Sequence, residues 1–360
     1  MTDLGIAFGR VAFMMFFVLN LGGLLTWVER KQSAIMQDRI GANRASILGL
    51  RLWGLFHPLA DAIKMLTKED FLPARADRFL FSLAPFVSIF FALVAFATIP
   101  FGDVLRFGGR EIPLQAVPLN AGILYVFAML SLGVYGVMMA GWASANNYAL
   151  LGGQRAAALM ISAEVAIGAS VMGVVMVYGS LDIMEIVRAQ GRLLAGWIPA
   201  WGILTQPLAF VLFLTAGIAV TRRIPFDFPE GESEIIGYFV EYSGMKFGMF
   251  AMADFLETVV ISGMATSLFL GGWQVPYLGP SGFSFPWGAA VALPHPAVVG
   301  LQMAAFALKV VLMLWFLMLV RWTLPRFRYD QAMRLGWLGL FPLSILNIVL
   351  TGAILLARRS

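Results

Sequence analysis

Acidic residues in an otherwise apolar chain are the first candidates for chemistry. The chain has 360 residues and 20 Asp and Glu, and five of these acids lie between Arg223 and Lys246 with no basic residue among them. They are Asp227, Glu230, Glu232, Glu234 and Glu241. Carboxylates in a poorly hydrated place hold protons more tightly, because desolvation and mutual repulsion both oppose ionisation. The segment is therefore a candidate for proton transfer.

Four further ionisable residues fall inside apolar segments. They are Glu164, Asp254, Glu257 and Lys309. A charge at the centre of a bilayer costs roughly 2.5–3.5 kcal/mol, so each needs a partner, a neutral state or water. Asp254 and Glu257 are three residues apart and share one helix face, which indicates a hydrated, proton-accepting wall. Lys309 can neutralise one of the acids, and the sequence leaves open which; satisfied buried pairs are the alternative to a functional site.

The acidic segment itself has two interpretations. Pro229 followed by two nearby glutamates is typical of an ordinary acidic helix start. A helix would place Glu230, Glu234 and Glu241 on one face, although two glycines weaken the helical prediction. Aromatic and aliphatic side chains interleaved with the acids favour a packed, buried site over a solvated face. These are Phe226, Phe228, Ile235, Ile236, Tyr238 and Phe239.

The elements that must position these residues are membrane-spanning helices. The chain is 60% hydrophobic and 12% charged, with a mean hydropathy of +0.84, whereas soluble domains carry roughly 25% charged residues. A bilayer core needs about 20 apolar residues per helix. The sequence therefore predicts an all-α polytopic membrane protein, one domain over residues 1–360, with eight transmembrane helices. The eight segments are 6–28, 79–100, 121–143, 156–178, 203–221, 245–272, 297–320 and 336–357.

The distribution of Lys and Arg predicts the orientation of these helices, because cytoplasmic loops are enriched in both residues. The connector 29–78 holds nine of them, and the stretch 273–296 holds none. We expect cytoplasmic connectors at 29–78, 144–155, 222–246 and 322–335, with both termini on the periplasmic side. The overall basic character, with a pI near 9.6, then reflects membrane orientation and not nucleic-acid binding.

Two connectors carry structure of their own. In the first, Leu59, Ile63 and Leu66 are spaced as one helical face after Pro58, which predicts an amphipathic helix at the membrane surface. The stretch 273–296 is uncharged and rich in Pro and aromatic residues, so we expect an ordered outer loop at the interface. His295, between two prolines, is expected to be part of a turn there.

Cysteine and histidine usage limits the cofactors. The chain has no cysteine and only two histidines. Disulfides and thiolate-held iron–sulfur clusters are therefore excluded, and a histidine-rich metal or haem site is disfavoured.

Seven motifs in fixed order are similar to those of a known family. They are ERK at 29–31, RIGANR at 39–44, PLADAIKMLTKED at 58–70, GWASANNYALLGGQRA at 141–156, PFDFPEGESE at 225–234, VEYSGMKF at 240–247 and RWTLPRFRYDQAM at 321–333. With them the chain resembles, over essentially its whole length, the quinone-site membrane subunits of respiratory NADH–quinone oxidoreductase (complex I).

The resemblance implies a membrane subunit of a proton-pumping enzyme in the bacterial inner membrane. The chain would count as an enzyme only as a subunit of this translocase, without a redox centre of its own. The substrate would be ubiquinone or menaquinone, and this chain would bind no metal, flavin or iron–sulfur cluster. Expected partners are the hydrophilic quinone-site and terminal iron–sulfur subunits, the small and antiporter-like membrane subunits, and lipid; nucleic acid is not expected. The electron donor and the quinone type are left open.

The resemblance also implies residue roles. An acidic proton relay would comprise Glu164, Glu230, Glu232, Glu234, Glu241, Asp254 and Glu257, with Lys309. The quinone passage would involve Glu29, Arg30, Arg39, Asp61, Lys64, Asp227 and Phe228. The chain departs from the family pattern at Ala42, His57, Leu159, Ala163, Asp254 and Phe255. Two of these departures remove hydrogen-bonding groups near Glu164, which puts the detailed proton path in doubt.

Two other functions are compatible with the same residues. A self-contained ion transporter would use the intramembrane acids, although no pair of broken half-helices repeats in the two halves of the chain. A membrane anchor or ion-translocating subunit of a related hydrogenase-type complex would share the fold. Ion flux through the isolated chain would favour the first, and copurification with hydrogenase-type partners would favour the second.

Overall fold

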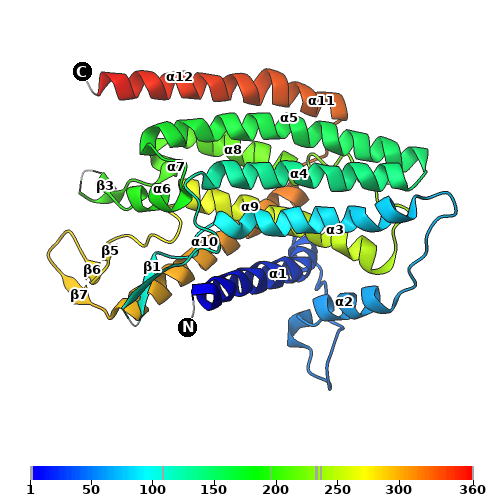
Figure 1. The fold of residues 1–360 in the computed structure, drawn as a ribbon, viewed down its shortest axis with the longest axis horizontal. Helices are drawn as coiled ribbons and strands as arrows, with labels where there is room; N and C mark the ends of the chain where they lie inside the picture. The colour runs from blue at the N-terminus through cyan, green and yellow to red at the C-terminus, as the bar shows by residue number, and fades with distance from the viewer. Residues whose placement is uncertain (1–2, 108, 195, 232–233, 236, 359–360) are drawn as a thin grey trace.

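The fold is built from helices with small sheets in the connectors (Figure 1). The computed structural model describes residues 3–107, 109–194, 196–231, 234–235 and 237–358. The α-helices are α1 (Asp3–Met36), α2 (His57–Thr67), α3 (Arg78–Ala95), α4 (Gly122–Ala143), α5 (Asn147–Tyr178), α6 (Ile183–Gln190), α7 (Gly202–Thr205), α8 (Pro207–Val220), α9 (Gly244–Phe269), α10 (His295–Thr323), α11 (Tyr329–Arg334) and α12 (Phe341–Ala357). Short 3-10 helices cover Leu52–Gly54 and Phe96–Thr98, and a π-helix, Leu335–Leu340, joins α11 to α12.

The strands form three antiparallel sheets in separate connectors. β1 (Val104–Phe107) pairs with β2 (Arg110–Pro113), and β3 (Leu193–Leu194) pairs with β4 (Ile198–Pro199). The stretch predicted as an ordered outer loop contains β5 (Leu278–Gly279), β6 (Gly282–Ser284) and β7 (Ala290–Ala292), in the order β5-β6-β7. His295 begins α10, and its Nε2 accepts a hydrogen bond from the backbone N–H of Arg106 at 3.1 Å.

The prediction of a polytopic helical membrane protein is confirmed. Within the described residues, seven helices are long and apolar enough to cross a membrane. The segment expected at 203–221 is different, because the helix breaks at Gln206 before Pro207 and α8 has only 14 residues. A helix of that length spans about 21 Å, which is less than the roughly 30 Å of a bilayer core. Gln206 bonds to Thr351 and Asn347 of α12 at 2.9 and 3.0 Å, so the broken region is held by polar contacts.

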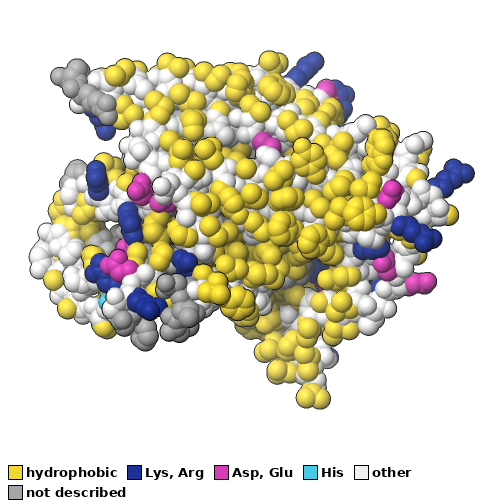
Figure 2. Space-filling view, in the orientation of Figure 1, with side chains coloured by type: hydrophobic (Ala, Val, Ile, Leu, Met, Phe, Trp, Pro, Cys, Tyr) yellow, Lys and Arg dark blue, Asp and Glu magenta, His cyan; other side chains and the backbone are white. Residues whose placement is uncertain are grey.

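The connectors sort to two ends of the helical bundle (Figure 1). α2 and the stretch that leads into α9 lie at one end, and the small sheets and both termini lie at the other. Between the ends, the surface is dominated by hydrophobic side chains, while most charged side chains gather toward the rims (Figure 2). This grouping agrees with the connectors that we assigned to a common side.

The amphipathic helix predicted in the first connector is α2. Its residues Leu59, Ile63 and Leu66 are all exposed, at 50%, 54% and 68%, so this chain leaves the apolar face of α2 uncovered. An apolar helix face beside the ends of spanning helices is suited to the membrane interface.

Candidate functional site

The acidic connector between α8 and α9 is not helical. Its described residues form turns and irregular segments until α9 begins at Gly244. The predicted helical face through Glu230, Glu234 and Glu241 is therefore wrong, as is the acidic helix start. Gly237 lies at φ +130°, a conformation that an α-helix does not contain. The packed interpretation is confirmed for Phe226, Phe228 and Tyr238, which are buried, whereas Phe239 is half-buried.

A buried charge cluster, formed by Arg222, Asp254 and Glu257, lies where this connector meets α9. Arg222 Nη2 is 2.5 Å from Asp254 Oδ1 and 3.0 Å from each carboxylate oxygen of Glu257. The side chains of Arg222 and Glu257 are 2% and 3% exposed. The two acids therefore share one helix face, as predicted, but their cation is Arg222 and not Lys309.

The charges around Arg222 favour this arrangement, whereas its backbone conformation opposes it. Arg222 has φ +54°, a left-handed conformation that costs a non-glycine residue about 1–2 kcal/mol. Burial alone would lower the pKa of Arg222, but the charges of Asp254 and Glu257 outweigh burial and raise that pKa above its ordinary value. The guanidinium therefore stays charged, and the ion pairs hold the strained residue in place.

A second ion-pair group centres on Glu29 of α1. Its Oε2 accepts from Arg223 Nη1 at 3.2 Å, and its Oε1 lies 2.8 Å from Arg321 Nη1 of α10. The Arg223 guanidinium also stacks over the Phe255 ring, 4.4 Å from its centroid. These contacts tie α1, α9, α10 and the connector together around one carboxylate.

The two ion-pair groups border an inner cavity of about 190 Å³. Glu230 and Asp227 also line it. Burial, and then the charges of Asp254 and Asp227, raise the pKa of Glu230 to about 8. Burial also raises the pKa of Asp227, whose Oδ1 has no hydrogen-bond partner. Glu230 is therefore mostly protonated at neutral pH and can donate that proton.

An outer cavity of about 290 Å³ lies between α1, α2 and α9. It shares four lining residues with the inner cavity, namely Glu29, Phe247, Ala251 and Phe255. Arg30 and Asp61, which pair at 2.7 Å, lie on its wall. Arg30 also lines a more open hollow of about 450 Å³ together with Arg39 and His57. The three spaces therefore follow one another from the first connector to the buried charge cluster.

The two remaining ionisable residues predicted inside the spans, Glu164 and Lys309, have different surroundings. Glu164 of α5 accepts a hydrogen bond from Ser131 Oγ of α4 at 2.8 Å, and its Oε1 is buried without a partner. Lys309 Nζ instead donates to the carbonyl oxygens of Leu270, Gly272 and Gln274, which follow α9, at 2.7–3.0 Å. Lys309 therefore caps the end of α9.

Several predicted site residues do not line these cavities. Glu234 is exposed and pairs with Arg155 at 2.7 Å, and Glu241 accepts from Asn146 at 2.8 Å. Phe228 packs edge-on against Tyr329. Lys64 is exposed on α2. Glu232 and Ile236 lie outside the described residues.

Sequence reasoning missed the arginines and the packing residues of the site. The sequence analysis gave Arg222, Arg223 and Arg321 no role in the site, although two adjacent arginines directly before an acidic run are a usable sign of pairing. The cavity walls at Phe247, Ala251 and Phe255 were also missed. Among the described residues, no group of three or more His, Asp or Glu is placed to hold a metal ion.

Comparison with known proteins identifies the family of the chain. Residues 9–352 match the family described as NADH dehydrogenase. An H subunit of NADH-quinone oxidoreductase from Geobacter metallireducens is 45% identical over 357 residues, covering 99% of this chain and 98% of the relative. An H subunit of the same enzyme from Geobacter sulfurreducens is 44% identical, covering 98% of each chain. The H subunit from Thermomicrobium roseum is also 44% identical, covering 94% of this chain and 92% of the relative. The chain therefore belongs to the NADH dehydrogenase family of NADH-quinone oxidoreductase H subunits.

Proposed function

We propose that the outer and inner cavities receive a quinone headgroup and that the acids behind them transmit its reduction into the membrane. The observation that carries the proposal is the shared wall of Glu29, Phe247, Ala251 and Phe255. It joins the outer cavity beside α2, which is mostly apolar, to the inner cavity, which is lined by more charged residues. A quinone has an apolar ring and tail and two polar carbonyl oxygens, so this gradient suits it. The exposed apolar face of α2 marks where the tail would meet lipid.

The chemistry assigned to this chain is proton supply and charge response. Reduction of a quinone to a quinol takes up two electrons and two protons, and the electrons would come from a hydrophilic partner subunit. Glu230 lines the inner cavity, and its raised pKa supports a role in which it would donate one of these two protons. The negative charge that remains would then compete with Asp254 and Glu257 for Arg222. That competition would change the proton affinity of Glu257 and, beyond it, Glu164.

The proposal includes the surroundings of the chain. The charged connectors would face the cytoplasm of a bacterium, with both termini on the periplasmic side of the inner membrane. The hydrophilic quinone-site and iron–sulfur subunits would dock there, and the small and antiporter-like membrane subunits would take up the relayed charge. Arg39 and the Arg30–Asp61 pair would lie along the quinone entry path.

Filling the shared wall tests the quinone site. In Ala251→Phe, the new ring would occupy the junction of the two cavities, so we expect the KM for quinone to rise about tenfold, in line with the 1–3 kcal/mol cost of overpacking. Electron transfer from NADH to a soluble acceptor that reacts before the quinone should be unchanged. Ala353→Phe, on an exposed part of α12, is the matched control. An unchanged KM in an assembled Ala251→Phe complex would remove the cavities from the quinone path.

Replacing Glu164 tests the relay. Gln can still accept the hydrogen bond from Ser131 but cannot take up a proton, so in Glu164→Gln we expect protons pumped per quinone reduced to fall by about tenfold or more. Glu185→Gln is the control, because Glu185 also accepts from a serine hydroxyl, Ser180 at 2.6 Å, but on the exposed side of α6. Both the protons pumped and the quinone reduced can be measured in proteoliposomes that contain the assembled complex. Normal pumping by assembled Glu164→Gln would contradict the relay.

A further inference from the structure

A large cavity at the opposite end of the bundle has no part in the proposed reaction. It has a volume of about 630 Å³ and lies between the first turns of α1, the β1–β2 hairpin and α10. This volume is within the range of roughly 300–1,000 Å³ typical of small-molecule sites. Gly9 leaves room beside it, because a Cβ built at that position meets no atom within 4 Å.

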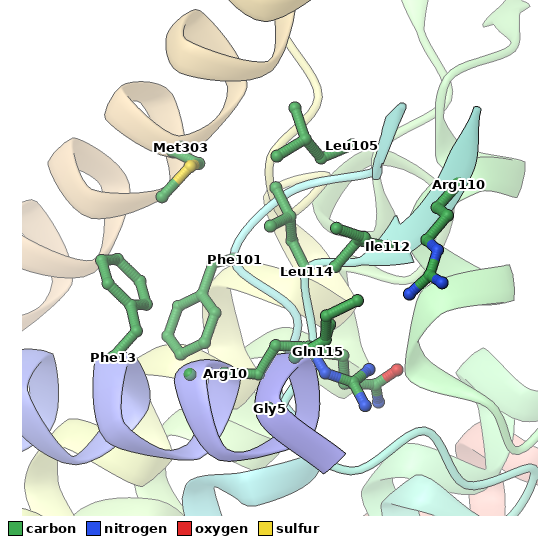
Figure 3. Close-up of a pocket in the computed structure, with 12 residues that line it drawn as sticks. Gly5, Arg10, Phe13, Phe101, Leu105, Arg110, Ile112, Leu114, Gln115 and Met303 are labelled. Carbon is green, nitrogen blue, oxygen red and sulfur yellow. The ribbon is translucent and has the colours of Figure 1, made fainter. Parts of the chain in front are cut away.

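The walls of this cavity are divided by chemistry (Figure 3). Phe13, Phe101 and Met303 lie on one side, while Arg10 and Arg110 lie on the other. Among the described lining residues there are two arginines and no Asp or Glu. The site thus offers positive charge next to an apolar floor.

Arg10 brings a buried donor without a partner to this cavity. Its Nη1 donates to the carbonyl oxygen of Pro113 at 3.5 Å, the limit of a hydrogen bond, and its buried Nε has no partner. A buried donor without a partner costs free energy, so an anion beside it would be stabilised. The acids nearest in sequence on the hairpin side have their own cations, since Asp103 pairs with Arg188 at 2.6 Å and Glu111 with Arg106 at 3.0 Å.

The position of the cavity favours a lipid over a water-soluble anion. It lies at the end of α1, a helix suited to cross the membrane, and so at the depth of lipid headgroups. Leu4 and Phe8, on the neighbouring part of α1, are 81% and 75% exposed, so acyl chains would contact the helix beside the cavity. We propose that this cavity binds an anionic phospholipid, with its phosphate at Arg10 and an acyl chain over Phe13 and Phe101.

Photolabelling of the assembled complex tests this site. The complex is reconstituted in phosphatidylcholine with a trace of phosphatidylglycerol that carries a photoactivatable acyl chain, or of the matching phosphatidylcholine probe. We expect the phosphatidylglycerol probe to label residues 4–13 and 101–115 about tenfold more than the phosphatidylcholine probe, because it adds a charge-assisted interaction. Added salt should reduce the preference, a measurement that needs no variant.

Variants separate headgroup recognition from simple apolar contact. Arg10→Gln should abolish the preference, whereas Arg192→Gln, an exposed arginine in another connector, should retain it. Gly9→Leu should reduce labelling by both probes, because it fills the cavity and leaves Arg10 in place. Equal labelling by the two probes in the wild type, or a preference that persists in Arg10→Gln, would overturn the proposal. Labelling that falls on a neighbouring protein in place of these residues would show that a protein covers the cavity, and would also overturn it.

Discussion

Replacement of Arg222 by Met is expected to destabilise the protein severely. Asp254 and Glu257 would lose their shared cation while remaining buried, and breaking a buried pair in this way costs about 3–5 kcal/mol. The Arg222→Met variant should therefore reach the membrane at a small fraction of the wild-type level, or melt at a clearly lower temperature in the purified complex. Thermal unfolding in detergent and the yield of assembled complex measure the two effects.

Neutralising the acids should rescue this defect. In Arg222→Met combined with Asp254→Asn and Glu257→Gln, no unpaired charge remains, so most of the lost stability should return while pumping stays absent. Arg222→Lys should be intermediate, because an ammonium group cannot reproduce the fixed fork of the guanidinium. Arg334→Met, at an exposed position of α11, is the control. Wild-type stability of Arg222→Met would show that the buried charge cluster is not held by this arginine.

The apolar helices could be predicted from the sequence because their signal is local. About 20 consecutive apolar residues indicate a span wherever the segment lies in the fold, and the spacing of Leu59, Ile63 and Leu66 sufficed for α2. The shortened α8 was missed because Gln206, although polar, lies in an otherwise apolar run. The contacts that justify the break, with Asn347 and Thr351, are more than 140 residues away in sequence.

The site could be predicted from the sequence only where the relative position of its residues is set within a single helix. The spacing of Asp254 and Glu257 placed both on one face, and the structure confirms that they meet the same partner. The identity of that partner depends on the tertiary structure and could not be predicted, because the sequence offers both Arg222 and Lys309 as cations. Lys309 instead donates to three backbone carbonyl oxygens. Every residue has a backbone carbonyl, so residue types give no sign of such a contact. The path of the connector likewise depends on contacts with distant elements, both the burial of its aromatic residues and its ion pairs, which its own charge pattern does not reveal.

The second large effect is expected at Glu230. Its carboxyl pKa is raised to about 8, so the group is protonated below that pH and loses its proton as the pH rises through it. If Glu230 supplies a proton to the quinone, quinone reduction should fall on the alkaline side with an apparent pKa near 8. Glu230→Gln should reduce the rate by about tenfold or more at pH 7, because a general acid contributes typically 10²- to 10⁴-fold. It should also remove the alkaline limb of the profile.

This dependence distinguishes proton donation from a structural role. Loss of a merely structural contact would lower the rate of Glu230→Gln at every pH and leave the alkaline limb in place. Asp offers the complementary variant, since Glu230→Asp retains an acid and should keep a limb of altered pKa. Glu69→Gln, an exposed glutamate after α2, is the control. Glu230→Gln should impair quinone reduction itself, whereas Glu164→Gln should impair mainly the protons moved per quinone. If both variants changed only the number of protons moved per quinone, Glu230 would belong to the relay. The proton donor would then have to be sought elsewhere in the inner cavity.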